Sequence, residues 1–252
     1  MRHFEKKSIS ERYDQFRPQV HKSVIKKMLE LASCEKKFQH VADIACGTGH
    51  STIPLLDYSE NVYGTDISKE MLNIAKEKNP RVTYYLTPAE DLPFDDGFLD
   101  AIFVCMALHW FDQKKFLAEA RRTLKSGGLL FVYNMSFPGT MVQNPRYNDW
   151  HTKEYWSKYP NPKRHNTALN KLLENNEQIQ LIENHSMDLS IDLDCLELRN
   201  YLLTQSNIDA AIDNGDSLES VERWIEEGIK PFFKSDKEQF IYSCELSHAK
   251  CI

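Results

Sequence analysis

The chain lacks the features that mark several classes of protein. Its formal charge is −6 over 252 residues, and without a basic excess it is poorly suited to contacts with nucleic-acid phosphates. Its longest apolar run, residues 99–108, contains Asp100 and is far shorter than the roughly 20 residues that cross a bilayer. Residues 1–18 hold no apolar segment typical of a secretory signal. We therefore expect a cytoplasmic protein with no nucleic-acid partner and no membrane association.

Clustered cysteines are missing as well. The chain has six, none in CxxC or CxxH spacing: Cys34, Cys46, Cys105, Cys195, Cys244 and Cys251. Scattered cysteines in a chain of this length are typical of reduced thiols. We therefore predict neither a disulfide framework nor a metal site.

The composition is that of a globular protein. Hydrophobic residues make up 41% of the chain and charged residues 27%, which is enough apolar material for a sizeable core. At roughly 150 residues per domain the length corresponds to about one and a half domains. We therefore predict that residues 1–252 form a single domain that carries a cap.

Strand-like and helix-like segments alternate in the first half of the chain. Helical apolar patterns occupy residues 18–33, 68–78 and 113–125, the last expected to be stopped by Gly127-Gly128. The strand-like segments are residues 41–45, 61–66, 81–86, 99–108 and 129–135, followed later by 179–191 and 239–246. This order is typical of βαβ units. We therefore predict an α/β fold: a Rossmann-like sheet of seven mostly parallel strands with helices on both faces.

Two segments interrupt this alternation. Residues 136–176 are rich in Pro, Asn, Tyr and Trp without clear periodicity, and residues 194–230 contain two or three helical patterns. We predict that both are insertions that form a helical and irregular cap over the sheet. Residues 179–191 and 239–246 would then be the final strands.

A glycine loop follows the first predicted strand. Residues 41–52, VADIACGTGHST, run from a buried strand through Gly47 and Gly49 to a helix start. Such a turn lets the backbone approach a ligand where a side chain would block it. Asp66 ends the next predicted strand, nineteen residues after Gly47. In a doubly wound sheet these strand ends are neighbours, and a carboxylate there can accept both hydroxyls of a ribose.

The loop departs from the dinucleotide-binding fingerprint. Its third glycine is missing, which disfavours a pyrophosphate cradle and hence a nucleotide oxidoreductase. Asp43 lies four residues before Gly47 and suits an ammonium group better than a phosphate, although it could instead be a buried carboxylate that accepts hydrogen bonds from the loop. A ribose, an adenine and an amino-acid group together describe S-adenosylmethionine.

The segment DIACGTGHST (residues 43–52) resembles motif I of the class I S-adenosylmethionine-dependent methyltransferases, commonly (D/E)xGxGxG, with Ala45 at the first glycine position. The similarity continues in AEDLPF (89–94), FLDAIFVCMALHWFD (98–112) and LKSGGLLFV (124–132), so that residues 10–135 correspond to the cofactor-binding core. Within this class, these motifs resemble the methyltransferase type 11 group.

Further motifs are similar to one subgroup of that class. YDQFRP (13–18) and HWFD (109–112) are similar to the trans-aconitate methyltransferases and related small-molecule carboxyl methyltransferases, and LRNYLLTQS (198–206) resembles their C-terminal helical part. The resemblance implies S-adenosylmethionine as cofactor, S-adenosylhomocysteine as product and a small-molecule acceptor. It favours O-methylation, with a carboxylate as one candidate acceptor. The alternatives are an N- or C-methyltransferase and a cofactor-binding protein without turnover. Either a monomer or a homodimer is compatible.

The resemblance also implies site residues. Those expected at the cofactor are Tyr13, Arg17, Asp43, Ala45, Gly47, Gly49, Asp66, Ile67, Met71, Ala89, Glu90, Cys105, Met106 and Ala107. Arg17 would pair with the cofactor carboxylate, unless it is a surface arginine before the first helix. Some of the Cys105–Ala107 residues could serve core packing alone.

His109 is the candidate catalytic residue. It could act as a general base for a hydroxyl or amine acceptor, or it could orient an acceptor carboxylate, which is already ionised. Trp110 is expected to wall the pocket. Tyr147, Trp150 and Trp156 either form a lid over the acceptor or build the core of the insertion, and the sequence leaves both open.

Overall fold

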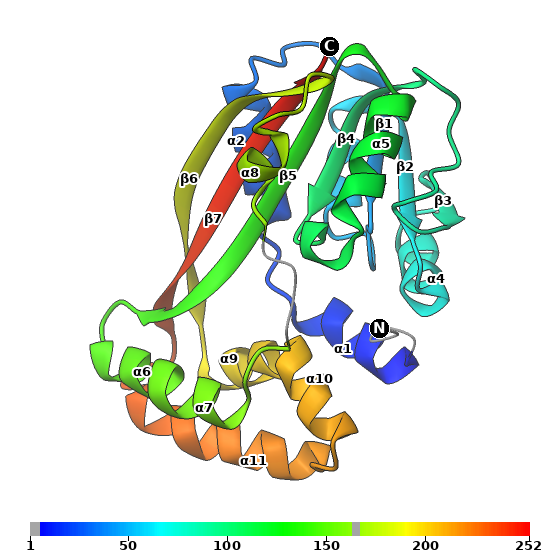
Figure 1. Ribbon diagram of the computed structural model, residues 1–252. Helices are drawn as coiled ribbons and strands as arrows, with labels where there is room; N and C mark the ends of the chain where they lie inside the picture. The colour runs from blue at the N-terminus through cyan, green and yellow to red at the C-terminus, as the bar shows by residue number, and fades with distance from the viewer. Residues whose placement is uncertain (1–5, 163–166) are drawn as a thin grey trace.

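A single sheet organises the computed structural model, which describes residues 6–162 and 167–252 (Figure 1). Within these residues seven strands pair in the order β3-β2-β1-β4-β5-β7-β6. Their bounds are β1 Phe38–Ile44, β2 Ser59–Asp66, β3 Thr83–Leu86, β4 Leu99–Cys105, β5 Leu124–Met141, β6 Ile179–Leu193 and β7 Glu238–Cys251. The first five strands are parallel, and β7 runs antiparallel between β5 and β6. The predicted Rossmann-like, mostly parallel sheet is confirmed.

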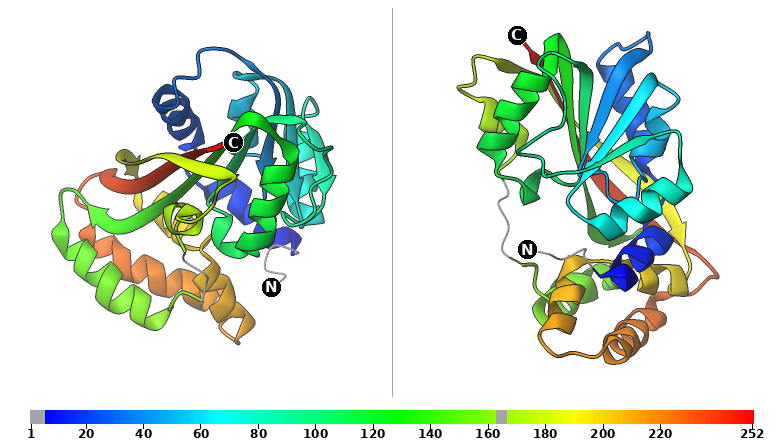
Figure 2. Two further views of the ribbon diagram at one scale, coloured as in Figure 1. Left: turned by 45° about the horizontal axis from the view of Figure 1, so that its top comes forward. Right: turned by 90° about the vertical axis from the view of Figure 1, so that its right-hand side faces the viewer.

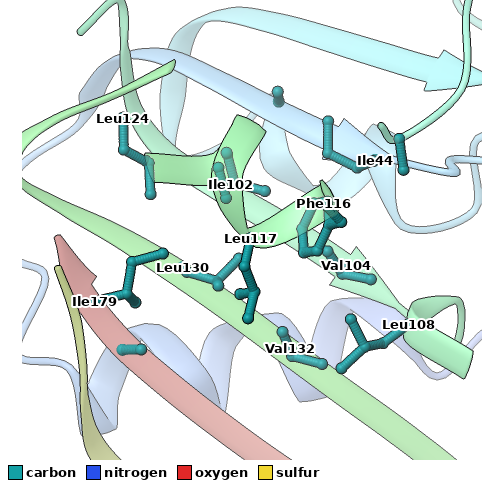
Figure 3. Packing of buried hydrophobic residues seen from close by; sticks show 14 of the residues in the cluster. Ile44, Ile102, Val104, Leu108, Phe116, Leu117, Leu124, Leu130, Val132 and Ile179 are labelled. Carbon is teal, nitrogen blue, oxygen red and sulfur yellow. The ribbon is translucent and has the colours of Figure 1, made fainter. Parts of the chain in front are cut away.

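Helices cover both faces of this sheet. The bounds of the covering helices are α2 His21–Leu31, α3 Thr52–Leu55, α4 Lys69–Lys78, α5 Gln113–Thr123 and α8 Leu169–Leu173. On one face α5 packs on the central strands and α8 packs beside β6, and Figure 3 shows Leu117 of α5 directed toward Leu130 of β5. On the other face α2 and α3 build a second apolar cluster with the same strands. The sheet is therefore buried on both sides, as its continuous apolar runs predict.

The helix α5 ends earlier than the sequence indicates. Asp112 caps it by accepting a hydrogen bond from the Lys115 N–H, and its apolar stripe is buried. It stops at Thr123 and not at Gly127-Gly128, because Leu124 is already extended, fully buried and paired with Leu99 of β4. Burial and strand pairing override the helical propensity of the LKS segment at this point.

The last three strands extend beyond the parallel part of the sheet and carry the cap (Figure 1). The cap elements are α6 Pro145–Trp150, the π-helical turn η2 His151–Tyr155, α7 Trp156–Lys158, α9 Cys195–Leu202, α10 Ser206–Asp213, α11 Leu218–Ile229 and the 3₁₀ turn η3 Lys230–Phe232. They share an apolar cluster with the adjoining ends of β5, β6 and β7. Not all of the first predicted insertion belongs to this unit: β5 continues to Met141, and α8 packs on the sheet through Leu169 and Leu173.

The helix α1, Lys7–Phe16, lies between the sheet and the cap (Figures 1 and 2). The sequence gives no clear helical pattern for it, because only Ile9 and Ser10 of its side chains are buried. The short 3₁₀ turn η1, Leu108–Trp110, follows β4 at the same end of the sheet. These two elements, the strand ends and the start of α10 enclose the site described below.

The contact between Gly228 and Trp150 provides a test of the cap's packing. A Cβ at Gly228, inside α11, would lie 2.6 Å from the Trp150 ring. In an exposed helix Gly→Ala stabilises by about 1 kcal/mol, whereas overpacking of a buried ring costs about 1–3 kcal/mol. We therefore expect Gly228→Ala to lower the free energy of unfolding in urea titrations, while the neighbouring exposed Glu227→Ala leaves it nearly unchanged. A more stable Gly228→Ala variant would contradict this close packing.

Candidate functional site

The candidate site is a pocket of about 290 Å³ at the carboxyl ends of β1 to β4, roofed by α1 and the start of α10. Its lining comprises Tyr13, Arg17, Ala45, Gly47, Asp66, Ile67, Met71, Thr87, Pro88, Ala89, Glu90, Cys105, Met106, Ala107, His109, Trp110, Phe111 and Ser206. In open parallel sheets this edge is where ligands bind.

Most of the residues singled out in the sequence meet in this pocket. Those that do not line it are Asp43, Gly49, Tyr147, Trp150 and Trp156. Four lining residues were not predicted: Thr87, Pro88, Phe111 and Ser206. Thr87 and Pro88 directly precede AEDLPF, and Phe111 lies within HWFD, so these two motifs could have indicated them. Ser206 ends LRNYLLTQS, but that segment carries no sign that it reaches the pocket.

The loop after β1 and the turn after β4 hold unusual backbone conformations. Ala45 and Met106 each have a φ of 57°, and Gly47 has a φ of 55°. The left-handed region is costly for residues with a side chain, yet both Ala45 and Met106 line the pocket. A Cβ built on Gly47 would meet nothing within 4 Å. The backbone of the loop is therefore open to approach from the pocket.

Asp66 ends β2 beside this loop. One carboxylate oxygen accepts the Gly47 N–H at 2.9 Å and the other accepts the Ser68 N–H at 2.8 Å. Burial raises the pKa of Asp66, and these backbone hydrogen bonds oppose the rise. Because each carboxylate oxygen has two lone pairs, both can still accept a hydroxyl from a ligand in the pocket.

Asp43 lies beneath the loop and is fully buried. Its Oδ2 accepts hydrogen bonds from the hydroxyls of Ser51 at 2.7 Å and Thr52 at 2.6 Å. Burial raises its pKa to about 6. Asp43 thus lies where it holds the loop in place. This position agrees with the alternative interpretation, a buried carboxylate that accepts hydrogen bonds from the loop. Gly49, with a φ of 85°, packs toward the Tyr84 hydroxyl and also lies outside the pocket.

Arg17 follows α1 and forms part of the pocket wall. Its guanidinium lies 4.8 Å from the centre of the Tyr13 ring and 5.4 Å from that of Tyr201, and it donates a hydrogen bond to the Thr204 carbonyl at 3.2 Å. No carboxylate of residues 6–162 or 167–252 lies within ion-pair distance of it. A partly buried cation of this kind can accept an anionic group of a ligand in a forked geometry.

His109 and Trp110 lie on η1, directly after the end of β4. Their ring centres are 5.0 Å apart, and Trp110 is 37% exposed. Both line the pocket, with Phe111 next to them. The site therefore combines a carboxylate, a cation and an imidazole around one cavity.

The predicted cap residues lie elsewhere. Tyr147 is fully buried and Trp150 is 5% exposed, with ring centres 5.9 Å apart. Trp156 packs against the same cluster. These rings fill the space between α6, α11 and the cap ends of β5, β6 and β7. Their positions agree with a role in the core of the insertion and not with a lid over the acceptor.

His21 gives the protein a pH dependence that can be measured. It is buried on α2, and its Nδ1 lies 2.6 Å from the Tyr133 hydroxyl. Burial lowers its pKa to about 3, against about 6.5 in the unfolded chain. The unfolded state therefore takes up the proton first, and this contribution to stability is lost as the pH falls below 6.5 toward 3.

The difference between the folded and unfolded pKa of His21 lowers the free energy of unfolding at pH 5 by about 2 kcal/mol relative to pH 8. We expect His21→Asn, which cannot titrate, to flatten the fall in unfolding free energy between pH 7 and pH 5 by about this amount. Urea unfolding at several pH values measures it. An identical slope in the variant would contradict a neutral, buried His21.

The part of the chain that the structure describes has neither a membrane-spanning helix nor a cluster of metal-ligating side chains. No helix there is both long and apolar enough to cross a membrane. Across residues 6–162 and 167–252, no three His, Cys, Asp or Glu side chains are grouped in a way that could hold a metal ion.

Comparison with known proteins gives a consistent result. Residues 42–132 match the family model of a methyltransferase domain. A Dictyostelium discoideum protein named as a methyltransferase is 29% identical over 60% of this chain and 59% of its own length. A demethylmenaquinone methyltransferase of Renibacterium salmoninarum is 38% identical over 40% of this chain and 43% of its own. The chain thus spans about half the length of these curated relatives.

The fold likeness covers more of the chain. A solved structure from Anaeromyxobacter dehalogenans, described as a type II methyltransferase, superposes with a TM-score of 0.72 at 18% identity, over 94% of this chain and 97% of the other. The predicted methyltransferase domain is thus confirmed over residues 42–132, and the fold of a solved methyltransferase extends over nearly the whole chain. The likeness to the trans-aconitate subgroup stays a prediction.

Proposed function

Since residues 42–132 form a class I, S-adenosylmethionine-dependent methyltransferase domain, we propose that the protein transfers a methyl group to an oxygen of a small-molecule acceptor. The observation that carries the proposal is the content of one pocket. The glycine loop and Asp66 lie on one side of it, and Arg17, His109 and Ser206 line it from other elements. The pocket can thus serve a cofactor and an acceptor together.

The residues present fit S-adenosylmethionine. The two oxygens of Asp66 keep lone pairs for the ribose hydroxyls. Ile67, which is 65% exposed, and Met71 give an apolar wall for the adenine. Ala89 and Glu90, which also line the pocket, would border the adenine edge. Arg17, which has no carboxylate partner among the described residues, pairs with the carboxylate of the amino-acid group.

When bound, S-adenosylmethionine supplies a methyl group on a sulfonium, a leaving group that needs no further activation. The chain itself has to hold the acceptor atom in line and to exclude water. Cys105, Met106 and Ala107 form the wall at the end of β4, and Trp110 flanks the opening. Positioning of this kind can supply up to about 7–11 kcal/mol of the barrier in favourable cases.

His109 lies where it can act on the acceptor. With a hydroxyl acceptor its imidazole takes the proton that is released on methylation. With a carboxylate acceptor no proton is released, and His109 orients the acceptor by a hydrogen bond. A carboxylate, as in the subgroup that the motifs resemble, is therefore one candidate.

A small acceptor is supported by several observations. The pocket is roofed by α1 and α10, its volume is about 290 Å³, and the net charge of −6 is unfavourable for nucleic acid. The R. salmoninarum relative is named for a quinone, which is a small molecule. C-methylation and N-methylation stay as alternatives. The protein acts in the cytoplasm as a monomer or a homodimer.

Two measurements test the proposal. Calorimetry with S-adenosylhomocysteine should show binding, and no binding at millimolar ligand would overturn it. Turnover with methyl-labelled S-adenosylmethionine across organic acids, phenols and amines should then give product from an oxygen acceptor. Binding without any turnover would favour the non-catalytic alternative, and product from amines or ring carbons alone would favour N- or C-methylation.

A further inference from the structure

Asp14, on α1, contacts the core at two places. Its Oδ1 lies 2.8 Å from His50 Nε2 and 2.6 Å from Lys78 Nζ. His50 belongs to the glycine loop after β1, and Lys78 is the last residue of α4. The carboxylate therefore bridges two elements that flank the pocket, although it does not line the pocket itself.

His50 is directed toward the N-terminal segment. Its side chain is only 4% exposed, and it is absent from the pocket lining. Besides Asp14, the amide of Gln19 lies 3.3 Å from its Nδ1, and the ring centres of Tyr13 and His21 lie 6.2 Å and 6.0 Å from its own. All of these neighbours come from α1, from α2 or from the segment between them. The glycine loop thus provides a binding surface for the N-terminal segment through its His50 side chain.

The same segment supplies two residues of the pocket wall. Tyr13 directly precedes Asp14, and Arg17 follows it by three residues, so all three are near one another on the helical path. The position of Tyr13 and Arg17 in the pocket therefore depends on how α1 is docked.

Two ion pairs bind α1 and its N-cap residue Lys6 to the cap. Arg12 pairs with Asp209 and Lys6 with Asp213, both on α10. In residues 6–162 and 167–252, every ion pair between α1 and the sheet-bearing part of the chain goes through Asp14. Without it, α1 would keep its ionic attachment to the cap and lose its ionic attachment to the glycine loop and to α4.

We propose that Asp14 is a positioning residue for the cofactor: by binding His50 and Lys78 it docks α1 on the glycine loop and sets Tyr13 and Arg17 in the pocket. This inference rests on the proposed function, because it assigns the docked helix to the same cofactor site. Both contacts of Asp14 are charge-assisted when its partners are protonated, and hydrogen bonds of this type are about twice as strong as neutral ones.

Asp14 stays ionised under ordinary conditions. Its partial burial by itself would raise the pKa, but the hydrogen bonds from His50 and Lys78 hold the pKa of this carboxyl well below its usual range. The negative charge needed for both contacts is therefore present at neutral pH.

The test compares Asp14→Asn with Glu11→Gln. Glu11 lies on the same helix, is exposed and pairs only with Lys7 among the described residues, so its substitution removes the same charge without touching the core contacts. We expect Asp14→Asn to weaken S-adenosylhomocysteine binding in calorimetry by about tenfold, and Glu11→Gln to leave it within about twofold. Circular dichroism and thermal unfolding verify that both variants fold.

Limited trypsin digestion gives a second readout, independent of affinity. Cleavage after Arg12, followed by mass spectrometry, reports undocking and local opening of α1. We expect faster cleavage in Asp14→Asn than in the wild type, and less protection by S-adenosylhomocysteine. Lys78→Met, which removes one of the two contacts from the α4 side, should shift both readouts in the same direction and serves if Asp14→Asn does not fold.

The outcomes separate this inference from the proposed function. If the wild type binds S-adenosylhomocysteine and Asp14→Asn binds it equally well, the positioning role is overturned and the proposed function stands, whatever the cleavage rates. If the wild type does not bind, both are overturned. If Asp14→Asn and Glu11→Gln weakened binding equally, the change in net charge would explain the effect, and the positioning role of Asp14 would be overturned.

Discussion

Asp66→Ala is expected to weaken the binding of S-adenosylmethionine and S-adenosylhomocysteine at least tenfold while the fold remains intact. The substitution removes the carboxylate that would accept the ribose hydroxyls, and hydrogen bonds to a charged group contribute about 1.5–3 kcal/mol. It also removes the acceptors of the Gly47 and Ser68 N–H groups, so the loop that faces the ligand is less well held. Isothermal titration calorimetry measures the change.

Two further variants make this result specific. Asp95→Ala removes an exposed carboxylate that lies outside the pocket lining and should leave the affinity unchanged. Asp66→Asn keeps one carbonyl acceptor, so its loss of affinity for the cofactor should be smaller than that of Asp66→Ala. Equal affinity in Asp66→Ala and the wild type would refute the assignment of Asp66 to the ribose.

Arg12→Met is expected to lower the free energy of unfolding by about 3–5 kcal/mol, the usual cost of removing one partner of a buried ion pair. Arg12 on α1 pairs with Asp209 on α10, and their side chains are 13% and 2% exposed. Methionine keeps much of the side-chain volume but leaves the Asp209 carboxylate without this cation. Urea unfolding followed by fluorescence measures the difference.

The double variant Arg12→Met/Asp209→Leu should recover most of the loss, because an apolar pair of similar size often replaces a buried ion pair at little cost. Lys6→Met is the matched control, since Lys6–Asp213 joins the same two helices at the surface with side chains 61% and 52% exposed. An exposed pair contributes less than about 1 kcal/mol. If Arg12→Met and Lys6→Met had equal effects, the buried pair would not stabilise the junction of α1 and the cap.

Much of the site could be predicted because its residues lie close to strand ends. Ala45, Gly47 and Asp66 follow or end buried strands whose apolar runs are visible in the sequence, and parallel strands bring their carboxyl ends to one edge. Ser206 was missed, because it enters the pocket from the cap, far along the chain. Its place depends on how α10 packs, which no local pattern specifies.

Asp43 and the cap aromatics show where sequence reasoning ends. The spacing of Asp43 from Gly47 fits a ligand contact and a buried loop anchor equally well, and only the hydroxyls of Ser51 and Thr52 on its Oδ2 place it beneath the loop. Tyr147 and Trp150 have the composition of a lid, yet they pack with each other and with Trp224 inside the cap. Burial of a side chain depends on which distant elements meet around it.

By itself the sequence determined the sheet, the glycine loop and the carboxylate at the end of the second strand, because hydrophobic periodicity and short motifs are set by neighbours in the chain. Only the tertiary structure decided that α1 docks between sheet and cap through Asp14 and Arg12. Partners of these side chains lie as far along the chain as Asp209. Such pairings arise from the packing of whole helices and strands, which no short stretch of sequence specifies. The part of the chain beyond the cofactor-binding core supplies the cap helices on which α1 packs.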